Sequence, residues 1–196
     1  MHKSFKRLML AAVLVASANM AIAQQADMPA PEVFQKGDQW EWRQFDNRTK
    51  LEEGKRTRTV VDVDGVAMFR TGRTNFQVSA AFLGNPRASK PWRVWPLEVG
   101  KKWSYDEDFS NAGGLSWNTK QDAEVVAYEE VTTPAGKFMA FKIEYKGFFR
   151  NNRGESGRQT GIHWYAPEVY ADVKQIHDDG YNMWTRELTA YKRAAP

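Results

Sequence analysis

The 196-residue chain contains no cysteine, only three histidines and, after its first 23 residues, no long apolar run. Without cysteine it can form no disulfide, thiolate nucleophile or cysteine-ligated metal site, and it lacks the residue that carries the lipid of a bacterial lipoprotein. A membrane-spanning helix needs about 20 consecutive apolar residues, and no later stretch approaches that length. An excess of one charge is also missing. Three of the 28 basic residues lie in the first 23 residues, and the remaining 25 face 24 acidic residues, a net charge of about +1. This balance argues against nucleic acid as a partner.

The first 23 residues have the pattern of a cleaved secretory signal peptide. They combine a positively charged start, a short apolar stretch and a small-x-small cleavage pattern, which are carried by Lys3, Lys6 and Arg7, by residues 8–16 and by Ala21-Ile22-Ala23. We expect cleavage after Ala23 and a periplasmic location, with no lipid anchor and no transmembrane segment left in the mature chain. An uncleaved N-terminal anchor is the alternative.

The remaining chain predicts a short linker followed by one domain. Residues 24–31 are polar, include two prolines and show no periodicity, which is typical of a disordered linker. From residue 32 to about residue 193 the pattern of residue types stays the same and no second linker interrupts it, so we expect a single domain at 32–193.

Short alternating patterns within this domain indicate antiparallel β-structure. Apolar or aromatic residues alternate with polar ones, as they do in strands that bury one face. The residues that we assign to the structural core on this basis are Trp40, Trp42, Trp103, Tyr105 and Trp164. Turn signals punctuate the chain, among them Glu53-Gly54, Asp64-Gly65, Pro134-Ala135-Gly136 and Asp179-Gly180. The sequence predicts an all-β fold of about nine to eleven strands, a single curved antiparallel sheet forming a sandwich or a half-open barrel.

Two segments of the domain echo each other. Gly37, Trp40 and Trp42 have the same spacing as Gly100, Trp103 and Tyr105, 63 residues later. Each predicts a tight turn at glycine and then a strand with two aromatic residues on one face. Duplication and convergence both account for the match.

Three stretches carry a resemblance to known families. Residues 95–103 contain the pattern PL-x-VG-x-x-W, residues 129–138 contain E-x-V-x-x-PAG-x-F, and residues 163–169 contain WYAP. Together they resemble the TapB-like and related exported bacterial β-domain families of unknown function, over residues 95–174. The resemblance implies an exported all-β domain, akin in shape to the half-open barrels of lipoprotein carriers. It implies no catalytic residues.

The aromatic pair Trp92 and Trp95 is the candidate ligand site. Residues three apart cannot share a face of a regular strand, so at least one ring should be partly exposed, or the chain should bulge at Pro96. The pair follows a loop, which would place it at a rim, where exposed rings bind sugars or acyl chains. Lys90 and Arg93 beside the rings could hold an anionic headgroup, or could only keep a sheet edge in solution. The predicted ligand-binding residues are therefore Lys90, Trp92, Arg93 and Trp95.

No catalytic or metal-binding motif stands out. The run Asp106-Glu107-Asp108 begins like a calcium-binding EF-hand loop but lacks the glycine at its sixth and the glutamate at its twelfth position. His163 is expected at an exposed or edge position, and His177 beside an exposed turn. Nucleophile-elbow, zinc-protease and phosphate-loop motifs are all missing from the sequence. We therefore expect no enzymatic activity, no metal and no cofactor.

These observations favour a non-catalytic binding or carrier module for an apolar or amphipathic ligand. A structural protein that docks to another cell-envelope protein is the first alternative, and an envelope hydrolase acting on glycan or lipid is the second. An apolar cavity above about 300 Å³ inside the sheet would favour the carrier.

Overall fold

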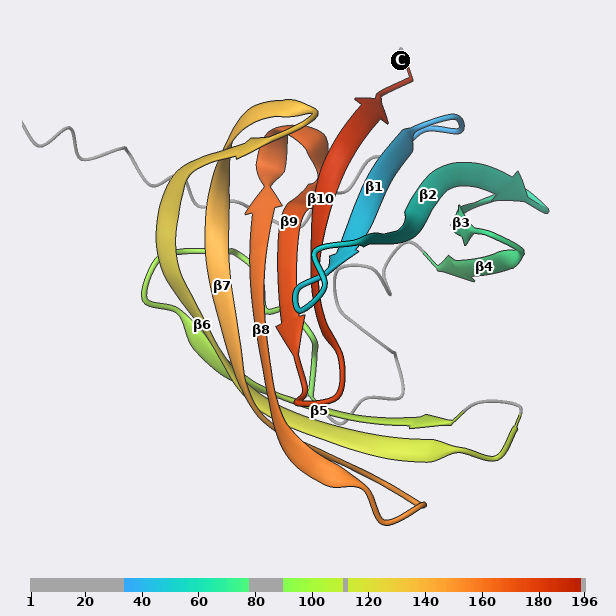
Figure 1. Ribbon diagram of the computed structural model, residues 1–196. Helices are drawn as coiled ribbons and strands as arrows, with labels where there is room; N and C mark the ends of the chain where they lie inside the picture. The colour runs from blue at the N-terminus through green and yellow to red at the C-terminus, as the bar shows by residue number, and fades with distance from the viewer. Residues whose placement is uncertain (1–33, 78–89, 111–112, 195–196) are drawn as a thin grey trace, which may run out of the picture.

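The computed structural model describes residues 34–77, 90–110 and 113–194. These residues form ten strands in one antiparallel sheet, in the order β4-β3-β2-β1-β10-β9-β8-β7-β6-β5 (Figure 1). The elements are β1 (Gln39–Asp46), β2 (Glu52–Val63), β3 (Val66–Thr71), β4 (Thr74–Gln77), β5 (Lys102–Ser110), β6 (Ser116–Thr133), β7 (Gly136–Asn151), β8 (Ser156–Ala166), the 3-10 helix η1 (Pro167–Val169), β9 (Ala171–Asp178) and β10 (Met183–Lys192).

The all-β fold with one curved antiparallel sheet is confirmed. Within the described residues, the edge strands β4 and β5 do not pair with each other, so the sheet is not closed into a barrel. Within 34–77, 90–110 and 113–194, no helix is long and apolar enough to cross a membrane. The predicted signal peptide at 1–23 and linker at 24–31 lie outside the described residues.

The sheet is strongly bent, and its concave side encloses the core. In Figure 1, β1 and β6 to β10 wrap around this core, while the lower ends of β5 to β8 turn away beneath it. We call these lower ends the arm: residues 106–110, 116–121, 147–151 and 156–160. Gly147, the first residue of the arm on β7, stands opposite Gln121 and Gln159. A β-carbon at Gly147 would overlap the carbonyl oxygen of Lys120, so only glycine fits here.

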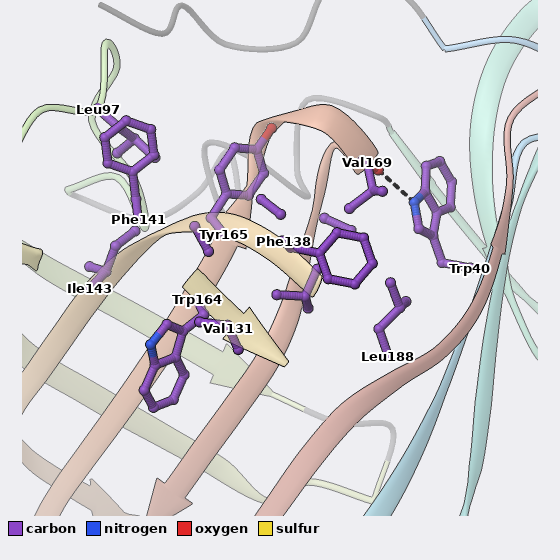
Figure 2. Packing of buried hydrophobic residues seen from close by; sticks show 14 of the residues in the cluster. Trp40, Leu97, Val131, Phe138, Phe141, Ile143, Trp164, Tyr165, Val169 and Leu188 are labelled. Atoms are coloured by element: carbon purple, nitrogen blue, oxygen red, sulfur yellow. Dashed lines mark hydrogen bonds between the residues drawn. The ribbon is translucent and has the colours of Figure 1, made fainter. Parts of the chain in front are cut away.

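Large apolar side chains fill the space inside the curve (Figure 2). Trp40 is 1% exposed and donates its indole N–H to the carbonyl oxygen of Val169, at 2.7 Å, which fixes η1 against β1. Trp42 makes the equivalent bond to the carbonyl oxygen of Asp172, at 2.8 Å. The side chains of the interior that are less than 2% exposed include Trp40, Phe69, Leu97, Phe141, Ile143, Tyr145, Tyr165 and Leu188.

The assigned core residues take different positions. Trp40, Trp42, Tyr105 and Trp164 are buried, whereas Trp103 is half-buried against the edge of the core. Trp164 is covered differently from the others. It stands opposite Lys142 and Lys174, whose ammonium groups lie 5.6 Å and 5.9 Å from its ring, and it donates to Glu129 at 2.8 Å.

Most of the expected turns occur where the sequence places them. Asp64 and Gly65 join β2 to β3 with φ of 53° and 80°, the positive values that a type I′ turn requires. The expected turn at Glu53-Gly54 is wrong, because both residues lie inside β2. The chain turns at residues 47–50 instead. There the Asp46 carboxylate accepts the backbone N–H groups of Arg48 and Thr49, at 2.8 Å and 2.7 Å.

The two echoing segments share one local structure. Gly37 and Gly100 both have positive φ, 96° and 90°. Their N–H groups donate to the carbonyl oxygens of Val60 and Val125, at 2.9 Å and 2.7 Å, on the strands that pair with β1 and β5. The same glycine turn therefore starts the β1–β2 and β5–β6 pairs.

Candidate functional site

The segment that contains Trp92, Arg93 and Trp95 lies inside the curve of the sheet and not at a rim. Arg93 is 2% exposed, and both tryptophans are half-buried against the core. Only Lys90 of the predicted set is exposed; it forms an isolated backbone bridge to Asp106 of β5. Arg93 is therefore buried and not at a rim, whereas both rings stay partly exposed, as expected for at least one of them. Their role in binding a ligand stays a prediction.

Trp92 is held by β5 and β7. Its ring stacks on Tyr145, with centroids 4.3 Å apart and planes 4° apart. Its carbonyl oxygen accepts hydrogen bonds from the Trp103 indole at 3.1 Å and from the Tyr145 hydroxyl at 3.2 Å. Trp95 packs edge-on against Tyr165 at 5.2 Å. Both rings find cover because residues 91–101 form no regular strand, so the period-two argument does not apply to them.

Arg93 is fixed by a carboxylate that the sequence did not single out. Its Nη2 lies 2.9 Å from Oδ1 and 3.3 Å from Oδ2 of Asp172 on β9. Asp172 Oδ2 also lies 3.0 Å from His163 Nδ1 and accepts the Gln175 amide at 2.9 Å. Burial by itself raises the pKa of Asp172, but the Arg93 charge and these hydrogen bonds outweigh it and hold that pKa well below its usual range. The pair is therefore ionised and ties the segment to the sheet.

His163 belongs to this cluster, which corrects the expected exposed position. It is 9% exposed, and its ring lies edge-on to Trp92 at 4.9 Å. Burial lowers the pKa of His163, against the opposing effect of Asp172. No local signal in the sequence indicates this position, because its partners come from β9 and from the segment before β5.

Polar side chains continue from Asp172 across the inner face of the sheet. His163, Gln175, Arg186 and Gln44 stand opposite one another on β8, β9, β10 and β1. The Gln175 amide oxygen accepts from Arg186 at 2.9 Å, and Gln44 donates to Glu53 at 2.8 Å. Directly opposite residues of antiparallel strands share a face. We call these four residues the inner polar row.

A cleft of about 440 Å³ opens next to this row, between the arm and the β9–β10 turn. We call it the aromatic cleft. Three rings from three separate parts of the chain line it, together with polar side chains; these residues are Trp117, Phe149, Tyr181, Gln159, His177 and Asn182. Phe149 and Tyr181 meet edge-on at 6.0 Å, and Tyr181 is 59% exposed. His177, expected beside an exposed turn, is half-buried, and its ring stacks on Trp184 at 5.1 Å.

The turn that presents Tyr181 is built on Asp179. Its carboxylate accepts the backbone N–H groups of Tyr181 and Asn182, at 2.9 Å and 2.6 Å, and lies 3.3 Å from His177 Nε2. Burial raises the pKa of Asp179, but the hydrogen bonds from Asn182 and Tyr181 outweigh this effect and lower it overall. This carboxylate therefore holds the turn that forms one side of the cleft.

A larger hollow of about 690 Å³ lies on the opposite face of the same strands. Half of its lining residues are charged, and some of these charges are paired. Lys120 pairs with Asp106 at 3.0 Å, and Lys146 pairs with Glu144 at 2.7 Å. Two rings line it, of which Phe148 is exposed and Tyr105 is buried. No three His, Asp or Glu side chains of the described segments come together as metal ligands would.

Comparisons with known proteins identify a fold and no family. No family model matches the chain, and no curated protein matches it. A solved structure from Parabacteroides distasonis, assigned as a lipoprotein, is 15% identical with a TM-score of 0.50, over 85% of this chain and all of that one. A protein from Bacteroides fragilis, assigned as exported with a YmcC-like fold, is 15% identical with a TM-score of 0.49, over 86% of this chain and all of that one. The likeness is one of fold. The TapB-like resemblance gains no support from these comparisons.

Proposed function

We propose that the protein is an exported, non-catalytic binding module of the cell envelope, which binds an amphipathic ligand in the aromatic cleft. The ligand class that the cleft favours is a saccharide. One observation carries the proposal: rings of Trp117, Phe149 and Tyr181 come from β6, β7 and the β9–β10 turn to line one opening, with amide side chains between them.

A saccharide fits this lining better than an acyl chain does. A sugar ring has an apolar C–H face, which packs on an aromatic ring, and hydroxyl groups at its edge, which form hydrogen bonds with amide side chains. Both kinds of side chain in the cleft would therefore contact a saccharide. An acyl chain needs a mostly apolar pocket. Here Gln159, His177 and Asn182 interrupt the aromatic surface. An exposed tyrosine such as Tyr181 also contributes contact area at a low entropic cost.

The charges near the cleft favour binding over catalysis. Hydrolysis of a glycosidic bond needs a carboxylic acid whose pKa is raised so that it can donate a proton. The pKa of Asp179 in the cleft is lowered, and so is that of Asp172 behind it. Neither carboxyl is suited to the acid role, and Glu155, which also lines the cleft, accepts the Asn151 amide. We therefore propose a module that binds without turnover.

The alternative, docking to an envelope protein by strand addition, has less support. Edge strand β5 carries Asp106, Glu107 and Asp108 as a continuous acidic run, and charged edges are a known means of preventing strand pairing. Export is supported by the signal-peptide pattern of residues 1–23 and by the names of the two structural neighbours, one assigned as exported and one as a lipoprotein.

Saturation-transfer NMR tests the proposal directly. The probe is the saccharide mixture released by mild acid from envelopes of the producing cells, with a short-chain fatty acid as the competing probe. We expect transfer to sugar ring protons and none to the acyl chain. One aromatic contact contributes about 0.5–1.5 kcal/mol, so Tyr181→Ala and Trp117→Ala should each weaken binding by roughly 2- to 12-fold.

Tyr191→Ala is the matched control, because Tyr191 is also an exposed tyrosine, 44% exposed, but packs against Phe138 away from the cleft. It should leave saccharide binding unchanged. Transfer to the acyl probe alone, no transfer to any saccharide, or equal losses in Tyr181→Ala and Tyr191→Ala would each contradict the proposal.

A further inference from the structure

Three arginines gather on the inner face of β2, β1 and β10. Arg56 stands opposite Trp42, and Arg186 stands opposite Gln44. Trp42 and Gln44 are two residues apart on β1 and so share a face, and directly opposite residues share a face as well. Arg58, two residues beyond Arg56, lies on this face too. Its guanidinium carbon is 5.6 Å from the Trp42 ring.

The two inner guanidinium groups have aromatic neighbours where carboxylates would be expected. Arg58 forms no hydrogen bond or ion pair through its side chain with the described residues. It lies over Phe69 and Phe76, at 5.1 Å and 5.4 Å. Its Nε is buried and without a hydrogen-bond partner in the described structure. Rings that face a guanidinium hold it by cation–π attraction and leave its N–H edge available.

Arg186 repeats this arrangement on β10. It lies 4.4 Å from the Trp184 ring, and its two Nη atoms donate to the neutral amide oxygens of Gln175 and Gln44. Its Nε is also buried and has no partner among the described residues. Both arginines are half-buried. Charged groups with buried N–H donors are normally paired with an opposite charge, so two such groups on one face favour a bound counter-ion.

The chain supplies little negative charge to this place. Asp172, the carboxylate that acts on both arginines, is already paired with Arg93 at 2.9 Å. Glu53 at the edge of the row accepts from Gln44 and not from an arginine. Burial and the neighbouring positive charges lower the pKa of Arg58 to about 10 and that of Arg186 to about 10.

We propose that Arg56, Arg58 and Arg186 form a binding site for a phosphate group, free or in the headgroup of an amphipathic molecule. Arginine is suited to this ligand because its planar fork gives paired hydrogen bonds to phosphate oxygens. A phosphate ester carries a charge of about −1.5 to −2 near neutral pH, which matches several arginines better than one carboxylate does. Arg56 is exposed to solvent. The site does not depend on the saccharide proposed for the aromatic cleft.

Inorganic phosphate is the first probe, measured by isothermal titration and by thermal unfolding against chloride at equal ionic strength. We expect phosphate to bind and to raise the melting temperature, since a ligand of the folded state stabilises it. Arg58→Met and Arg186→Met should each weaken phosphate binding at least tenfold. Without phosphate both variants should melt no more than a few degrees from the wild type, because each removes a repelling charge.

Arg43→Met is the matched control. Arg43 alternates with Trp42 and Gln44 on β1, so it lies on the other face, where it pairs with Glu187 at 3.4 Å. It should keep full phosphate binding, as should the cleft variant Tyr181→Ala. This separates the site from the proposed saccharide cleft, because either can fail alone.

Dihexanoyl phosphatidic acid is the second probe and distinguishes the source of the phosphate. Much tighter binding of this lipid than of inorganic phosphate assigns the site to a headgroup, and similar affinities assign it to a free phosphate group. The proposal is overturned if neither probe binds, or if Arg58→Met and Arg186→Met bind phosphate as well as Arg43→Met does.

Discussion

Replacing Arg93 with methionine should destabilise the protein severely, because it leaves a buried carboxylate without its cation. Arg93 is 2% and Asp172 11% exposed, so solvent screens this pair weakly. Breaking a buried ion pair by removing one partner costs about 3–5 kcal/mol. At about 2–4 °C per kcal/mol for a chain of this length, Arg93→Met should lower the melting temperature by roughly 6–20 °C.

A double-mutant cycle separates the ion pair from the packing of the arginine. Urea unfolding of Arg93→Met, Asp172→Asn and the double variant gives the three free energies that the cycle needs. The double variant should recover much of the loss, since neither charge is then left alone. The half-exposed pair Arg43–Glu187 is the control, and Arg43→Met should cost under about 1 kcal/mol. A loss in Arg93→Met as small as that of the control would refute the tethering role of the pair.

Three further outcomes follow from the same contacts. Trp92→Ala should cost about 3–5 kcal/mol by urea unfolding, far more than a rim residue would, because it removes the ring stacked on Tyr145; a cost under about 1 kcal/mol would contradict the packing. Gly147→Ala should cost about 1–3 kcal/mol or more, because the added carbon would overlap the Lys120 carbonyl oxygen. In Gly161→Ala the added carbon would meet its nearest neighbour at 3.5 Å, so this variant should cost under about 1 kcal/mol. Equal melting temperatures of the two variants would contradict the close backbone contact at Gly147. Since burial lowers the pKa of His163, the unfolded state takes up the proton first, so stability should hold above about pH 7 and fall as the pH drops below about 6.5. His163→Gln should reduce this fall between pH 7 and pH 5, and an unchanged pH profile in this variant would count against the buried neutral ring.

Local patterns in the sequence predicted the strands and most of the turns. Period-two alternation identifies a strand that buries one face, and it marks Trp40 and Trp42 of β1 in this way. Asp64-Gly65 sets a turn through its own backbone preference, so it needs no knowledge of the rest of the chain. The turn at residues 47–50 depends on hydrogen bonds to the Asp46 side chain. This is a weaker sequence signal than Glu53-Gly54, so the turn was predicted at Glu53-Gly54 instead.

The candidate sites could not be found in the same way. Arg93 and Asp172 are 79 residues apart, and neither stands out from other charged residues until β9 is placed beneath the segment before β5. The aromatic cleft likewise joins Trp117, Phe149 and Tyr181, which come from three separate parts of the chain and meet only in the folded sheet. The spacing of Trp92 and Trp95 predicted partial exposure, which both rings show, but it could not predict that an irregular segment packs them against Tyr145 and Tyr165.

The indole resonances of the protein give the most direct test of the proposed binding site. In a ¹H–¹⁵N spectrum each indole N–H is a separate reporter, with Trp117 in the aromatic cleft and Trp92 and Trp95 in the segment that the sequence favoured. On addition of the envelope saccharides, the Trp117 resonance should shift in proportion to occupancy, while those of Trp92 and Trp95 stay in place. Shifts confined to Trp92 and Trp95, or no shift at any indole, would contradict binding at the cleft.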